Sequence, residues 1–164
     1  MAAVDYFLKI DGIEGESTDS KHPKEIELES WSGGATNSGQ SQTSGRSGGG
    51  TGRVTFQDFH FVKHTDKSSA KLMLACATGE HIPKAVLTCR KAGTTGQVFM
   101  TVTMEHLLVS SFQTGGSGHS DIVPTDQISM NFTKIKIEYK EQKADGSLGG
   151  ATKAGYDIKS QKKV

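Results

Sequence analysis

The stretch VTFQDFHFVKHTDKSSAKLMLACATG, residues 54–79, changes its apolar period midway and so places a strand directly before a helix. Its first part, VTFQDFHFV, alternates as a half-buried strand does, and its later part, KSSAKLMLACA, has the spacing of a helix. Asp66 is the expected N-cap and Gly79 the expected left-handed C-cap. One helix is therefore predicted at about residues 66–78.

The apolar positions within this stretch also predict packing. Val54 and Phe56 are followed by Phe59 and Phe61, and this change of face indicates a β-bulge near Gln57–Asp58. We expect one face of the helix to pack on a sheet rather than to form a cofactor site. The residues of that face are Ala70, Met73, Leu74 and Ala77, with Leu72 and Cys76 at its flanks.

Strand patterns dominate the rest of the chain. The predicted strands span residues 4–10, 25–31, 54–62, 85–91, 97–109 and 127–139, with a short final strand at 154–159. A second change of face indicates a bulge near Thr133–Lys134. Gly-rich turns separate the strands, so the chain is predicted to be mainly antiparallel β, a two-sheet sandwich or partly closed barrel with one flanking helix.

Residues 32–52, SGGATNSGQSQTSGRSGGGTG, have the composition of a flexible linker. A linker needs a domain on each side, and only 31 residues precede this one. We therefore predict a long loop or an extended hairpin inside a single domain that spans residues 1–164. Ordered loops of this length are uncommon and usually functional.

Composition narrows the function further. The chain has 164 residues, of which 20 are glycine and only 34% are hydrophobic. This is little apolar material for a core, which favours either long solvated loops or completion of the fold by partner subunits. The net charge of +1 gives no electrostatic support for nucleic-acid binding.

The termini and cysteines indicate a protein made in the cytoplasm. Asp5 and Lys9 interrupt the apolar residues of the N-terminus, so neither a cleaved signal peptide nor a membrane-spanning helix is predicted. Cys76 and Cys89 form no CxxC pair. A disulfide stays open as an alternative, but two inert thiols are the favoured interpretation.

No arrangement of residues indicates catalysis, a metal site or a cofactor. The six histidines match no ligand motif such as HExxH and are interpreted as surface or loop residues. Residues 45–53, GRSGGGTGR, lack the Lys-Ser/Thr of a phosphate loop, and Ser110–Ser111 has no GxSxG context. Glu25, Glu27 and Glu29 share one strand face, which is typical of a solvated or pore-facing stripe.

Several stretches in the same order along the chain resemble the Hcp (haemolysin-coregulated protein) family, the tube proteins of type VI secretion systems. The matching stretches are DYFLKIDGIEGESTD, FQDFHFVKHTDKSSAKLMLACATGEHIPKA, RKAG at residues 90–93, LVSSFQTGGSG at 108–118 and ISMNFTKIKIEYKEQKADGSLGG. The helix stretch followed by VSS and TGGSG is the part of this pattern that is most specific for the family.

This resemblance implies a barrel-like fold, a homo-hexameric ring and stacking of rings into a hollow tube that is fired with a spike at its tip. It implies effector proteins held in the lumen, contacts with spike, sheath and baseplate components, and secretion without a signal peptide. It implies neither nucleic-acid binding nor membrane insertion. With no room for a toxin domain, the chain is interpreted as a plain, non-enzymatic tube subunit.

The resemblance also implies sites. The extended loop is expected to reach a neighbouring subunit or ring, and the strand over residues 27–34 is expected to face the lumen. The expected stacking residues are Gln40, Gln42, Thr43, Arg46 and Gly49, and the expected lumen residues are Ser32, Glu29 and Ser30. The alternative is a monomeric β-barrel that binds a small ligand or anion through its Gly-rich loop. A hydrolase ranks third, because no nucleophile–base pair can be named.

Overall fold

The computed structural model describes residues 4–38, 54–92 and 96–164. The strands are β1 (Val4–Ile10), β2 (Ile26–Leu28), β3 (Ser30–Asn37), β4 (Val54–His64), β5 (Ile82–Lys91), β6 (Val98–Gly115), β7 (Thr125–Gln142), β8 (Leu148–Asp157) and β9 (Lys162–Lys163), and the helix is α1 (Ser68–Thr78). The predicted helix and the predicted predominance of strands are both confirmed.

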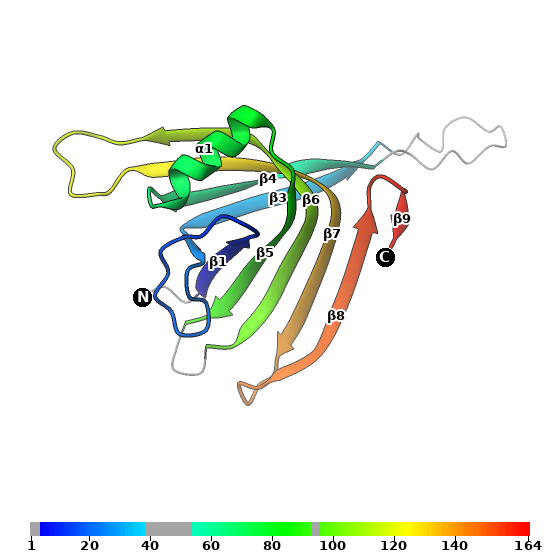
Figure 1. Cartoon of the computed structure of the whole chain (residues 1–164). Helices are drawn as coiled ribbons and strands as arrows, with labels where there is room; N and C mark the ends of the chain where they lie inside the picture. Colours follow the sequence, from blue (N-terminus) through cyan, green and yellow to red (C-terminus); the bar gives the residue numbers. More distant parts are fainter. Residues whose placement is uncertain (1–3, 39–53, 93–95) are drawn as a thin grey trace.

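The strands pair antiparallel in the order β2-β1-β5-β6-β7-β4-β3, with β8 on β7 and β9 on β8. The two ends of this path, β2 and β3, are consecutive in the chain and are separated only by Glu29, so the sheet coils back toward itself (Figure 1). β7 pairs with β4 along its first part and with β8 along its second part. The barrel-like β fold with one flanking helix is therefore as predicted.

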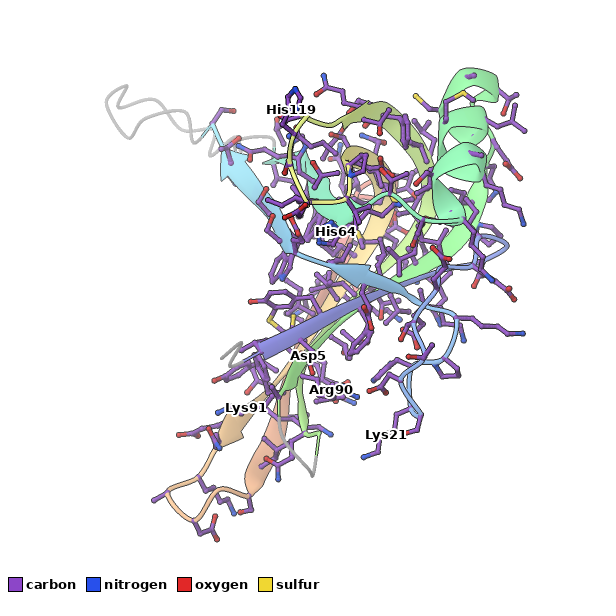
Figure 2. All side chains as sticks on the ribbon, turned by 90° about the vertical axis from the view of Figure 1, so that its left-hand side faces the viewer. Asp5, Lys21, His64, Arg90, Lys91 and His119 are labelled. Carbon is purple, nitrogen blue, oxygen red and sulfur yellow. The ribbon has the colours of Figure 1, made fainter. Side chains whose placement is uncertain are left out.

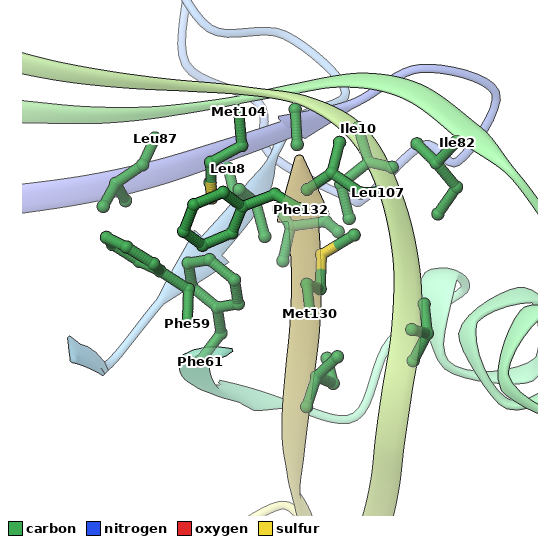
Figure 3. Close-up of a cluster of buried hydrophobic side chains, with 14 of the residues drawn as sticks. Leu8, Ile10, Phe59, Phe61, Ile82, Leu87, Met104, Leu107, Met130 and Phe132 are labelled. Carbon is green, nitrogen blue, oxygen red and sulfur yellow. The ribbon is translucent and has the colours of Figure 1, made fainter. Parts of the chain in front are cut away.

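The core fills the inside of this coil. Figure 3 shows the side chains of β1, β4, β5, β6 and β7 meeting there. Those with essentially no exposed surface include Leu8, Phe61, Leu87, Met104 and Met130. Alternation along each strand explains why these positions point inward while their neighbours do not.

The predicted bulge in β4 is confirmed. Ser32 pairs with His60 and Gly34 with Gln57, so two residues of β4 lie opposite the single Gly33 of β3. A Cβ on Gly33 would lie 2.5 Å from the ring of Phe59, which explains the glycine. The first six residues of the predicted loop, 32–37, are therefore part of a strand, and the segment is the connection of an extended hairpin.

The second predicted bulge, near Thr133–Lys134, is wrong. Glu105 faces Lys134 and Leu107 faces Phe132, so β6 and β7 stay in register across this point and no residue is inserted. Both strands instead change their buried face together, and His106 on β6 adopts a left-handed φ of 54°. The buried residues on either side of the change are Met104 and Leu107 in β6, and Phe132 and Ile135 in β7.

The predicted buried face of α1 is wrong. Its buried residues are Ser68, Leu72 and Ala75, whereas Met73 and Leu74 are 50% and 57% exposed. Spacings of four and three residues fit the observed face as well as the predicted one, and the small Ser68 and Ala75 let the helix approach the sheet closely around Leu72. Ala70 and Ala77 are also exposed.

The predicted C-cap is confirmed, whereas the N-cap is Lys67, one residue after the predicted Asp66, whose side chain still binds the first turn. The Asp66 carboxylate accepts the N–H of Ser68 at 2.8 Å, and the Ser69 hydroxyl accepts the N–H of Asp66 at 3.0 Å, which is a reciprocal capping arrangement. Gly79 is left-handed, with a φ of 65°. The predicted short final strand at 154–159 is longer and starts earlier, because β8 begins at Leu148.

Candidate functional site

One outer surface of the sheet is built from small polar side chains. In register across four neighbouring strands, Ser32 of β3 lies beside His60 of β4, His60 beside Ser129 of β7, and Ser129 beside Ser111 of β6. The residues next to them in sequence, such as Phe59 and Phe61, point into the core, so this row lies on the opposite side. We define the polar face as Ser30, Ser32, Asp58, His60, Ser111, Gln113, Gln127, Ser129 and Asn131; the apolar Val62 and Leu108 lie among them in register.

Hydrogen bonds across strands order part of the polar face. The ring Nδ1 of His60 lies 2.6 Å from the hydroxyl of Ser129. The Asp58 carboxylate accepts from the Ser110 hydroxyl at 2.6 Å and from the Asn131 amide at 3.0 Å. These bonds satisfy the larger polar groups. The side chains that remain available are mostly small and neutral, and they can exchange hydrogen bonds with water or with another protein.

The predicted lumen residues lie in two places. Ser30 and Ser32 are exposed on the polar face, and neither side chain has a hydrogen-bond partner within the described residues. Glu29 lies at the bend between β2 and β3, where its Oε1 is 2.5 Å from Nε2 of the half-exposed His64. The predicted stacking residues Gln40, Gln42, Thr43, Arg46 and Gly49 lie outside the described residues.

Sequence reasoning missed most of the polar face. His60 stands between two buried phenylalanines, and Ser129 stands between the buried Ile128 and Met130. A polar residue between two core residues of a strand must point away from the core, and this signal could have found both of them. The pairing of the strands, which places them in one row, is not readable from local patterns.

A buried ionic cluster fixes β4, β7 and the start of α1 to one another. Nζ of Lys63 lies 2.8 Å from both Asp126 and Asp66, and 2.9 Å from the hydroxyl of Ser69. Burial alone would raise the pKa of Asp126, but hydrogen bonds from Lys63, Ser69, Thr114 and Thr65 outweigh it and lower this pKa to about 2. Asp126 is thus ionised at neutral pH, and the donors and acceptors of the cluster are paired with one another.

A second cluster holds the loop between β1 and β2. Arg90 of β5 donates to Asp19 at 2.7 and 2.9 Å and to Asp5 at 3.1 Å, and its guanidinium lies over the ring of Phe7. The hydrogen bond from Arg90 holds the pKa of Asp19 well below its usual range. Figure 2 places Arg90 beside Asp5, away from the β6–β7 loop that carries His119.

Among the described strands that lack a full partner on one side, β3 and β8 offer the longest free backbone edges, while β2 and β9 are three and two residues long. β3 pairs only with β4, and β8 pairs with β7 on one side and, through Tyr156 and Asp157 alone, with β9 on the other. Unpaired edges of this kind are templates for pairing with another chain. They are candidates for contacts between subunits.

Within residues 4–38, 54–92 and 96–164, no group of three or more metal-ligating side chains is assembled. Cys76 and Cys89 are free thiols, and burial raises the pKa of Cys89 to about 11, so it is protonated at neutral pH. No helix in the same ranges has the length and apolar character needed to span a bilayer.

Comparisons with known proteins agree with one another. A family model described as "Type VI secretion system effector, Hcp" matches residues 7–139. The protein hcp1 of Pseudomonas aeruginosa is 45% identical over 159 residues, which cover 96% of each chain.

Solved structures give the same picture. A protein described as a type six secretion system protein superposes with a TM-score of 0.91 at 30% identity and covers 99% of this chain and 100% of its own. Hcp1 from Salmonella typhimurium superposes with a TM-score of 0.80 at 34% identity and covers 99% of both chains.

Proposed function

Because the chain belongs to the Hcp family of type VI secretion proteins, we propose that it builds the secretion tube as a homo-hexameric ring that stacks with further rings. Membership makes it a tube protein of this machine. The number of subunits, the stacking and the cargo are the proposed part. The alternative of a monomeric ligand-binding barrel is not favoured by these relatives.

The polar face is the observation that supports a lumen wall. It spans four adjacent strands of one subunit and carries small, mostly neutral side chains on a rigid sheet. Apart from Val62 and Leu108, a wall of this kind offers hydrogen bonds with little apolar attraction and no strong field, which suits weak contact with varied effector proteins. We place Ser30 and Ser32 on this wall, with Glu29 at its margin.

The free edges of β3 and β8 support ring closure. In a ring, each edge is covered by the next subunit, which removes an aggregation liability and adds interface stability to a chain with few core residues. Native mass by light scattering, with negative-stain images, tests this proposal. Six-fold rings are expected, and a monomer at every concentration would exclude the tube role.

The cargo proposal is tested at Ser32. Ser32→Tyr places a bulky ring on the polar face and should lower the amount of a lumenal effector that co-purifies with the rings. Ser20→Tyr, at an exposed loop serine, is the matched control, because it adds the same side chain elsewhere. Rings with unchanged effector retention in Ser32→Tyr would remove Ser32 from the lumen.

The stacking proposal is tested by deleting residues 38–50. Asn37 pairs with Val54, so the strand ends on both sides of the segment are already adjacent, and the three remaining residues have a common hairpin length. Rings should persist while tubes become shorter or rarer in images. Tubes of normal length would exclude the expected stacking residues, Gln40, Gln42, Thr43, Arg46 and Gly49.

The remaining parts of the proposal follow from the family. We infer that the protein has no catalytic activity of its own, that it contacts spike, sheath and baseplate components, and that it leaves the cell through the machine itself. A strain that lacks a functional secretion machine should retain the protein in the cytoplasm. Equal amounts in the medium with and without the machine would contradict this route.

A further inference from the structure

Two imidazoles outside the polar face meet on the protein surface. His81, in the turn that leads into β5, and His106, on β6, have their ring atoms Nε2 and Nδ1 only 3.0 Å apart. Both side chains are exposed, and neither makes another hydrogen bond or ion pair within the described residues. The contact joins two positions that are 25 residues apart in the chain, and strand pairing brings them together.

The backbone at His106 is unusual. A φ of 54° inside a strand is a left-handed conformation that is unfavourable for a residue with a side chain. Ile82 pairs with Leu107 and Lys84 with Glu105, so the residue opposite His106 is Pro83, which has no N–H to donate to the ladder. The kink in β6 and the proline in β5 thus coincide where the two imidazoles meet.

The ring geometry is close to that of a metal site. In a tetrahedral site with metal–nitrogen bonds of 2.0–2.1 Å, two imidazole nitrogens lie about 3.3 Å apart and their ring centroids about 5.2 Å apart. Here the nitrogens are 3.0 Å apart and the centroids are 5.2 Å apart, with the rings tilted by 31°. With these two distances the rings point almost end to end, as in the N–H···N hydrogen bond that they form, so each ring must turn away from the N–N line by about 35° to direct both lone pairs at one tetrahedral ion.

The surroundings favour a cation. His81 lines a surface hollow of about 510 Å³, whose other described lining residues include the carboxylates of Asp11 and Glu80 and one cation, Lys71. Neither carboxylate forms an ion pair with a described residue. These three charged side chains of the hollow sum to a net negative charge, which lowers the energy of an ion beside His81.

We propose that His81 and His106 form a two-histidine site for a borderline divalent metal ion of the zinc, nickel or copper class, with water in the remaining positions. Imidazole suits these ions, whereas magnesium and calcium prefer oxygen ligands. In the neutral tautomers that bind metal, the outer nitrogen of each ring carries the proton and faces solvent, so binding leaves no buried donor unpaired.

Titration calorimetry on full-length, tag-free, metal-stripped protein at neutral pH tests this site with zinc, nickel and magnesium chlorides. Saturable binding of one zinc or nickel ion per chain is expected, with none for magnesium. His81→Gln and His106→Asn should each weaken binding by about 10-fold or more. Asparagine is chosen at His106 because it tolerates the left-handed conformation.

His119→Ala is the matched control, because it removes an exposed loop histidine with the same local φ sign and should leave binding unchanged. Circular dichroism confirms that each variant is folded, and His81→Gln decides alone if His106→Asn is not. The proposal is overturned if the unaltered protein shows no saturable site, or if a folded variant at either position binds as tightly as before. Neither outcome bears on ring assembly, which is measured separately.

Discussion

Lys63 of β4 and Asp126 of β7 form an ion pair with both side chains fully excluded from solvent, and Nζ lies 2.8 Å from Oδ2. Asp66 and Ser69 complete the cluster from the start of α1. Such a pair contributes little compared with apolar residues of the same size, but the loss of one partner leaves the other charged and buried. The junction of the helix with the two strands therefore depends on both residues.

Replacement of Lys63 by methionine should lower the free energy of unfolding by about 3–5 kcal/mol, because Asp126 is left as an unpaired buried charge. Denaturant unfolding at one fixed protein concentration measures this loss. The control is Lys153→Met, which removes a surface pair with Glu138 at 3.8 Å and should cost less than about 1 kcal/mol. Similar losses in the two variants would contradict the role given to the buried cluster.

Acid should destabilise the protein partly through Asp126. Its pKa is about 2 in the folded chain and about 3.9 in an unfolded one, so its ionised form stabilises the fold above about pH 4, and this contribution disappears as the pH falls from about 4 to 2. Asp126→Asn should therefore be less stable at neutral pH but show a shallower acid slope. Unfolding curves over this pH range measure both effects. Identical slopes of stability against pH in the two proteins would show that Asp126 does not contribute to the acid destabilisation.

Two adjacent glycines of β3 should respond differently to alanine. A Cβ at Gly33 would lie 2.5 Å from the buried ring of Phe59, which has no room to move, and a loss of about 1–3 kcal/mol is expected. A Cβ at Gly34 meets only the end of the Gln57 side chain at 3.3 Å, and a change within about 0.5 kcal/mol is expected. Thermal unfolding of the two variants compares them, and equal stability would contradict the close packing of Gly33.

The orientation of α1 predicts that alanine at Leu72 and alanine at Leu74 will affect stability differently. Leu72→Ala should lower the free energy of unfolding by about 2–5 kcal/mol, because this side chain is fully buried. Leu74→Ala removes a side chain that is 57% exposed and should change it by about 0.5 kcal/mol or less. Denaturant midpoints of the two variants report the buried face directly, and a larger loss at Leu74 would restore the face expected from the sequence.

Local patterns were sufficient for the elements themselves. Strand β4, its bulge and the Gly79 cap of α1 follow from residue spacing and from the conformational freedom of glycine, both of which act over a few residues. None of these features requires knowledge of which strands are neighbours.

The pairing of the strands and the rotation of α1 about its own axis could be read only from the tertiary structure. The buried face of α1 was mispredicted because two faces have helical spacing, and the choice between them depends on how closely the sheet approaches. The row from Ser32 to Ser111 and the contact of His81 with His106 join residues that only strand register brings together.

The sequence by itself determined an antiparallel β chain with one capped helix, a long Gly- and Ser-rich connection and its family, because these depend on short-range chemistry and on order along the chain. Tertiary structure alone decided the four-strand polar face, the buried pair of Lys63 and Asp126 and the two facing imidazoles. The physical reason is that packing and register select one arrangement from several that satisfy the same local preferences.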